Sequence, residues 1–84
     1  MANPNHPNMI EEKAILHYNK FKSLRDHFVR DTFTGQLFTV LKSRMIKDDQ
    51  NDFKVLVQIR NEMTGVESEV DSEYANSHFK EYKA

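Results

Sequence analysis

The chain has 84 residues, a net charge of −1 and no cysteine. This length suffices for one small domain, and the lack of thiols excludes disulfides, zinc-thiolate sites and cysteine catalysis. The first residues contain neither a basic segment nor an apolar core, and no apolar run approaches the ~20 residues that span a bilayer. We therefore expect a cytoplasmic protein that does not contact a membrane.

The N-terminal part of the chain predicts a tail followed by a helix. Residues 1–8 contain both prolines and little to bury, so we expect a disordered tail before a single domain over residues 9–84. Asn8 followed by Glu11 is typical of a helix start. Apolar residues then recur at three- and four-residue steps, which predicts a helix of about four turns. This stripe comprises Ile10, Ala14, Tyr18, Phe21 and Leu24, and Phe28 either extends it or opens a strand.

After this helix the period of the apolar residues changes from about 3.6 to 2. Residues 37–46 are rich in β-branched and apolar side chains, and residues 47–52 form a polar break. Residues 53–60 alternate cleanly, which places Phe53, Val55, Val57 and Ile59 toward a core and Lys54, Gln58 and Arg60 away from it. Residues 66–70 alternate too. The last residues return to helical spacing through Tyr74, His78 and Tyr82, with Asp71 or Ser72 as the cap.

Two similar segments, RDTFTGQLFTV (30–40) and RNEMTGVESEV (60–70), each centre on Thr-Gly. They hold the chain's two glycines, Gly35 and Gly65, and each lies between strand-like runs. Glycine supplies the positive φ of tight hairpin turns, so the repeat predicts two β-hairpins and no duplicated functional motif. A two-residue loop at 64–65 would pair apolar residues and set Arg60 opposite Glu69. A four-residue loop with left-handed glycine suits the residue types better. The pairing of apolar residues across the strands favours the two-residue loop.

These elements predict an α+β fold with an N-terminal helix, a four-stranded antiparallel sheet of two β-hairpins and a short C-terminal helix. Strand lengths and turn spacing over residues 27–71 are also compatible with a small SH3-like open barrel. Residues 20–47 carry +5, from seven Lys/Arg and two Asp, whereas residues 48–84 carry −5, from four Lys/Arg and nine Asp/Glu. If the two segments pair in a sheet, we expect their charges to interleave and largely cancel.

The surface residues suggest a binding protein. One side of the sheet would present an aromatic among basic residues, bordered by acidic ones; these candidates are Phe38, Lys42, Arg44, Lys54, Arg60, Glu67 and Glu69. Such a mixed surface favours a protein partner. Basic residues with an aromatic also suit single-stranded nucleic acid, which is the alternative partner.

Catalytic and metal-binding patterns are missing from the sequence. The four histidines share no metal-binding spacing, and residues 48–52 lack the Gly and Glu that complete a calcium loop. Glu67, Glu69 and Asp71 would lie along one exposed strand face, where no cleft perturbs them. We expect no enzyme activity, no metal and no cofactor. We interpret the chain as a small regulator that occludes or recruits a larger partner, as accessory proteins of phages and mobile elements do.

Overall fold

The computed structural model describes residues 10–47, 49–50 and 52–82. The elements are α1 (Glu11–Ser23), β1 (Phe28–Asp31), β2 (Leu37–Lys47), β3 (Phe53–Asn61), β4 (Glu67–Asp71), α2 (Ser72–His78) and β5 (Phe79–Glu81). The expected tail at residues 1–8 and the cap at Asn8 lie outside the described residues. Neither α1 nor α2 is long and apolar enough to cross a membrane.

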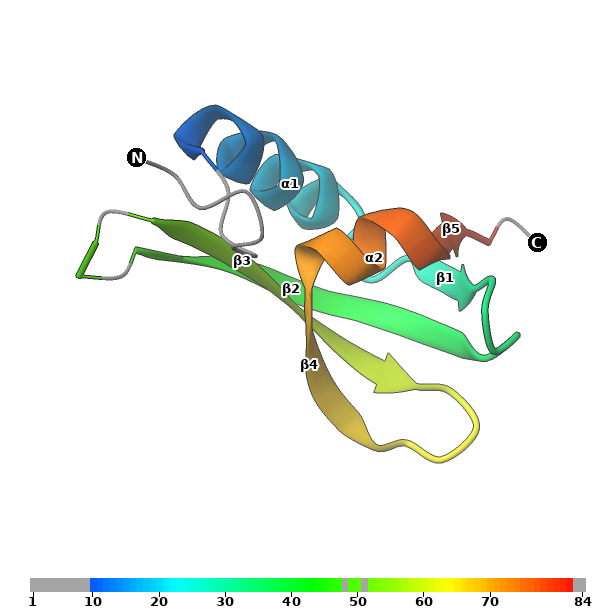
Figure 1. The fold of residues 1–84 in the computed structure, drawn as a ribbon. Coiled ribbons are helices and arrows are strands. Elements are labelled where there is room, and N and C mark those ends of the chain that lie inside the picture. Colours follow the sequence, from blue (N-terminus) through cyan, green and yellow to red (C-terminus); the bar gives the residue numbers. More distant parts are fainter. Residues whose placement is uncertain (1–9, 48, 51, 83–84) are drawn as a thin grey trace.

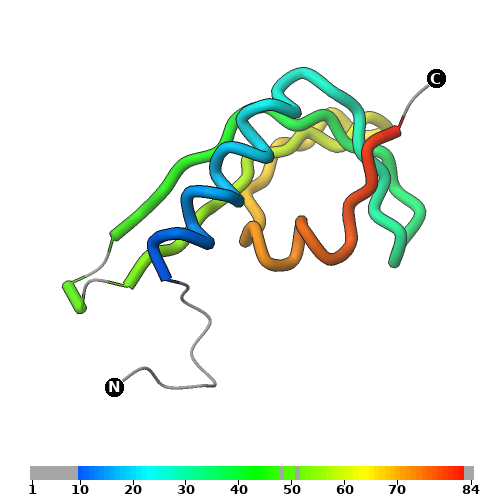
Figure 2. The backbone as a smooth tube through the Cα atoms, turned by 90° about the horizontal axis from the view of Figure 1, so that it is seen from above, coloured from blue at the N-terminus to red at the C-terminus, as the bar shows by residue number. Residues whose placement is uncertain are grey.

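The strands form one antiparallel sheet in the order β4-β3-β2-β1-β5, and both helices lie on the same face of it (Figure 1). Seen from above, α1 and α2 run beside each other across this face (Figure 2). The α+β class, the terminal helices and the antiparallel hairpins were therefore predicted correctly. The sheet has five strands, so the expectation of four was wrong. The sheet is open, because β4 pairs with β3 alone and β5 with β1 alone. The barrel arrangement was wrong.

The C-terminal helix ends earlier than its sequence pattern indicated. Asp71 caps α2 as predicted, with its Oδ1 accepting the amide of Glu73 at 2.8 Å. The helix stops at His78, and the next three residues form a fifth strand along β1. Phe79 is thereby buried beneath the helices, and its ring stacks on Phe38 with centroids 5.5 Å apart. This tertiary burial outweighs the helical spacing through Tyr82.

Helix α1 uses the predicted stripe in part. Ala14 and Phe21 are buried, but Ile10 occupies the N-cap position and is exposed. Acidic residues fill the first turn and basic residues the last, as the helix dipole favours. His17 is also buried, beside this stripe.

The core lies between the helices and the inner face of the sheet. Along β3, Val55, Val57 and Ile59 are buried, while Lys54 is exposed, so the predicted alternation is confirmed. The main buried cluster joins residues from β1, β2, β3, α1, α2 and β5; it comprises Phe21, Val29, Phe38, Val40, Val57, Ile59, Ala75 and Phe79.

The two Thr-Gly segments form the same turn, hydrogen bond for hydrogen bond. Asp31 Oδ1 accepts from the amides of Phe33 and Thr34, and Asn61 Oδ1 accepts from those of Met63 and Thr64. In each turn the glycine amide donates to the carbonyl four residues earlier at 2.7 Å. Gly35 and Gly65 have φ of 78° and 74°. The repeat is thus one turn used twice, as predicted.

The loop length, however, is four residues in both turns. The amide of Asn61 donates to the carbonyl of Val66, which leaves residues 62–65 in the loop. Arg60 consequently lies opposite Glu67, and Glu69 lies opposite Gln58. The two-residue loop and its Arg60–Glu69 pairing were wrong, because the left-handed glycine conformation decided the turn.

Replacing either glycine by alanine should strain the turn. Nothing lies within 4 Å of a Cβ added at Gly35 or Gly65, so the cost comes from the positive φ alone. We expect Gly35→Ala and Gly65→Ala each to lower the free energy of unfolding by about 1 kcal/mol in urea titrations. Met63→Ala is a matched control in the same turn, because this side chain is 93 % exposed. Equal stability of the glycine variants and the wild type would contradict the turn assignment.

Candidate functional site

The sheet face opposite the helices is called the open face here. The strand registers place on it side chains from all five strands. They are Phe28, Arg30, Leu37, Thr39, Lys42, Arg44, Ile46, Lys54, Leu56, Gln58, Arg60, Glu67, Glu69, Asp71 and Lys80, together with Tyr82, which directly follows β5. No helix covers this face in the described part of the chain (Figure 1).

Six of the seven candidate residues lie on the open face, and Phe38 does not. The register of β2 against β3 shifts between Val40 and Lys42, which marks a bulge. A bulge sets two residues of one strand opposite one of its partner, so the alternation changes phase there. Phe38 and Lys42 therefore point to opposite faces although both have even numbers. Phe38 is only 9 % exposed, in the core, and the prediction of its surface position was wrong.

A bidentate ion pair crosses the open face over β3. Arg44 of β2 donates from Nε and from a terminal nitrogen to the two carboxylate oxygens of Glu69 on β4, at 2.7 and 2.9 Å. These hydrogen bonds hold the pKa of Glu69 below its usual value and raise the pKa of Arg44. The planar guanidinium fits a carboxylate in this way, so the pair fixes both side chains in one geometry.

Two further ion pairs lie on this side of the sheet. Glu62 accepts from the Thr39 hydroxyl at 2.6 Å and from Arg60 Nε at 3.2 Å, and these bonds lower its pKa. Lys54 lies 4.0 Å from Asp71. Lys42 and Glu67 form no ion pair with any described residue. The central open face is thus a mosaic of alternating charges with little net sign.

Two aromatic side chains on the open face were missed by the sequence analysis. Phe28 and Tyr82 are 43 % and 42 % exposed, and the amide of Tyr82 donates to the carbonyl of Phe28 at 2.8 Å. The guanidinium of Arg30 lies 5.1 Å from the centroid of the Tyr82 ring. Tyr82 was assigned to a helical stripe, so nothing in the sequence pattern paired it with Phe28.

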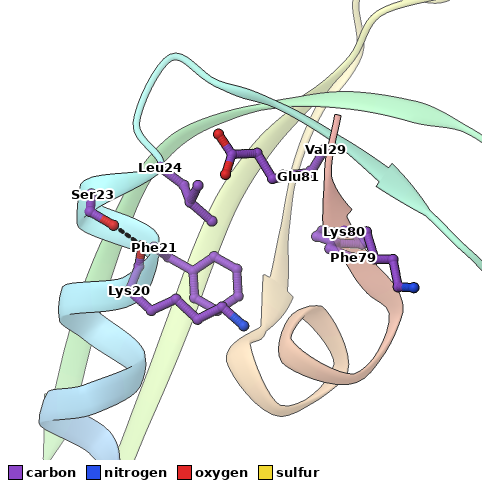
Figure 3. Close-up of a pocket in the computed structure, with 8 residues that line it drawn as sticks. All are labelled: Lys20, Phe21, Ser23, Leu24, Val29, Phe79, Lys80 and Glu81. Carbon is purple, nitrogen blue, oxygen red and sulfur yellow. Dashed lines mark hydrogen bonds between the residues drawn. The ribbon is translucent and has the colours of Figure 1, made fainter. Parts of the chain in front are cut away.

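A hollow of about 560 Å³ lies on the helix side, between the end of α1 and β5 (Figure 3). Its floor is apolar, with Phe21, Val29 and Phe79, and Lys20 lies at its edge. Lys80 also belongs to the lining, but its side chain points away from the hollow (Figure 3). Glu81 is the one carboxylate among its eight lining residues, and its Oε2 lies 2.9 Å from Nδ1 of His27. The hollow therefore combines an apolar floor with one carboxylate that is paired with a histidine outside the lining.

Buried Asp31 is the strongest candidate for chemistry on the helix side. Burial alone would raise its pKa, but hydrogen bonds from the Tyr74 hydroxyl and from the amides of Phe33 and Thr34 outweigh burial and lower the pKa. The same contact, 2.7 Å long, raises the pKa of Tyr74. A carboxylate held ionised by three donors is a structural anchor. It ties the first turn to α2.

Comparison with protein-family models, curated proteins and solved structures finds no match to this chain. Among the described residues, no three His, Cys, Asp or Glu side chains are placed to hold a metal ion. The function of the site therefore has to be inferred from the geometry of this chain alone. That geometry offers an open, charge-paired sheet face with apolar side chains among the ions.

His17 should make the stability of the fold depend on pH. Its Nδ1 lies 2.9 Å from the hydroxyl of Ser72, which joins α1 to α2. Burial, with Lys13 and Lys20 nearby, lowers its pKa below 6.5, although Glu73 and Asp71 oppose this shift. The folded state therefore favours the neutral ring. Its stabilisation is complete above about pH 6.5 and is lost as the pH falls through the lower folded pKa.

Urea unfolding between pH 7.5 and 5 tests this expectation. We expect the wild type to lose more stability over this range than His17→Gln, which cannot titrate at this position. The other histidines contribute equally to both proteins, so the difference isolates His17. Parallel pH profiles would refute the assignment.

Proposed function

We propose that this protein is a non-enzymatic binding module whose open face docks on another protein and thereby occludes or recruits it. The observation that carries the proposal is the arrangement of both helices on one face, so that no described residue outside the sheet covers the helix-free face (Figure 1). That face presents Phe28, Ile46 and Tyr82, each more than a third exposed, among ion pairs. Exposed apolar groups with a polar surround are typical of protein-binding surfaces.

The charge distribution supports a protein partner over nucleic acid. Arg44, Lys54 and Arg60 each have a carboxylate neighbour on the open face. Phosphate binding would require these cations to give up their partners, and Glu67 and Glu69 would repel the backbone. A protein surface accommodates both signs, and the ion pairs hold their side chains in place before contact.

One observation favours the alternative, nucleic-acid binding. Phe28 on β1 lies beside Tyr82, which directly follows β5, and Arg30 and Lys80 are next to them. Stacked bases and phosphates suit this combination of aromatic rings and cations. It occupies one end of the open face, away from the carboxylates of β4.

Site-specific photo-crosslinking tests the protein-binding proposal. A crosslinking amino acid replaces Lys42 on the open face or, as the control, Lys22 on α1, and each variant is expressed in cells that naturally carry the chain. We expect one discrete covalent protein adduct from position 42 and none from position 22. Equal labelling at both positions would contradict a partner on the open face.

An oligonucleotide titration decides the alternative. Under the protein-binding proposal, single-stranded and duplex oligonucleotides bind weakly at physiological salt, and Lys42→Glu changes this as little as Lys22→Glu does. Tight binding with a steep salt dependence, lost on Lys42→Glu or Tyr82→Ala and retained on Lys22→Glu, would establish nucleic acid as the ligand instead.

A further inference from the structure

Strand β4 is an edge of the sheet, and no described strand pairs with its outer side. The amide of Asn61 donates to Val66, so Asn61 and Val66 form a hydrogen-bonded pair. Hydrogen-bonded and non-hydrogen-bonded pairs alternate along an antiparallel ladder. The pairs Ile59–Ser68 and Val57–Val70 are therefore bonded, whereas Arg60–Glu67 and Gln58–Glu69 are not. The amides and carbonyls of Glu67 and Glu69 consequently point outward from the sheet.

The two sides of this edge differ in chemistry. Glu67, Glu69 and Asp71 lie on the open face, and Glu67 has no ion-pair partner among the described residues. On the helix side, Val66 is exposed and Val70 is half-buried. A strand added here would meet carboxylates on one side and valines on the other.

From this geometry we propose that β4 binds an extended segment of a partner protein by strand addition, in which basic and apolar residues alternate. Backbone groups of Glu67 and Glu69 supply the hydrogen bonds, as in other β-strand additions. Basic side chains of the added strand lie beside Glu67 and Asp71, and its apolar side chains pack against Val66 and Val70. This inference rests on the proposed function and specifies that the partner protein contributes an extended segment.

A second copy of this chain does not suit the same edge. Antiparallel pairing of two β4 strands about Glu69 would set Glu67 opposite Asp71 and Glu69 opposite its own copy. Like charges directly opposite each other destabilise a strand pair, and charged edges are a common protection against self-association. Charge repulsion therefore disfavours pairing of two β4 strands, whereas the same carboxylates attract a basic strand.

The test uses the full chain and a blocked peptide of alternating Lys and Val, about seven residues long, which spans the length of β4. We expect saturable binding of this peptide and none of the corresponding Glu-Val peptide. N-methylation of one alternate set of peptide amides should abolish binding, and methylation of the other set should not, because only one edge of an added strand pairs. Equal effects of both sets would overturn strand addition.

Amide hydrogen exchange measured by NMR gives the decisive reading. In the free protein the amides of Ser68 and Val70 should exchange slowly and those of Glu67 and Glu69 fast. Peptide binding should slow the exchange of the Glu67 and Glu69 amides. If the peptide binds while these two amides remain fast, the contact is only charge attraction and the proposal is wrong. A protein mass that increases with concentration without peptide would show a second copy at the edge and would also overturn it.

Two variants at position 67 distinguish the contribution of the backbone amide to peptide binding from that of the side-chain charge. Glu67→Pro removes the outward amide, which an edge strand tolerates, and should abolish peptide binding. Glu67→Ala keeps that amide and should weaken binding about two- to fivefold, as loss of an exposed ion pair does. Slow exchange at Ser68 and Val70 confirms that both variants keep β4 paired. If these peptide tests fail while the crosslink at position 42 succeeds, strand addition at β4 is refuted and the proposed function stands. If the crosslink fails, the proposal of a partner on the open face is refuted.

Discussion

Burial of the inner side of the β2–β3 ladder organises this fold. These are the two longest strands, and Val40, Val55, Val57 and Ile59 present one apolar row between them. Two helices of 13 and 7 residues supply the cover. Both helices are used on this side of the sheet, so no described helix is left to cover the other face.

The separation of charge along the sequence disappears in space for the same reason. Pairing of β2 with β3 and of β3 with β4 brings the basic and acidic segments together. Arg44 and Glu69, 25 positions apart, then form the bidentate pair that crosses the open face. Interleaving of the charges was predicted on condition of pairing, and the ion pairs between these strands confirm it. It is the reason we propose a protein partner, since a surface of both signs suits protein better than phosphate.

The two identical turns show how one local solution serves two environments. Asp31 and Asn61 hold their turns through the same side-chain oxygen. Asp31 uses its second oxygen to accept from Tyr74, and Thr32 binds the carbonyl of His78, so the first turn is tied to α2. Met63 in the second turn and Phe33 in the first remain exposed at the same end of the sheet. The repeat is a folding device, and its differing partners explain why one copy carries a carboxylate.

The features that could be predicted from the sequence are those that depend on local period and local backbone preference. The alternation in residues 53–59, the helical stripe at Ala14 and Phe21, the Asp71 cap and the positive φ of both glycines are of this kind, because each reflects a few neighbouring residues. Tertiary structure decided the rest. Burial of Phe79 turned the end of a helical pattern into β5, and the bulge after Val40 moved Phe38 to the core. The open face with Phe28 beside Tyr82, and the free edge of β4, follow from strand order, which no local pattern contains.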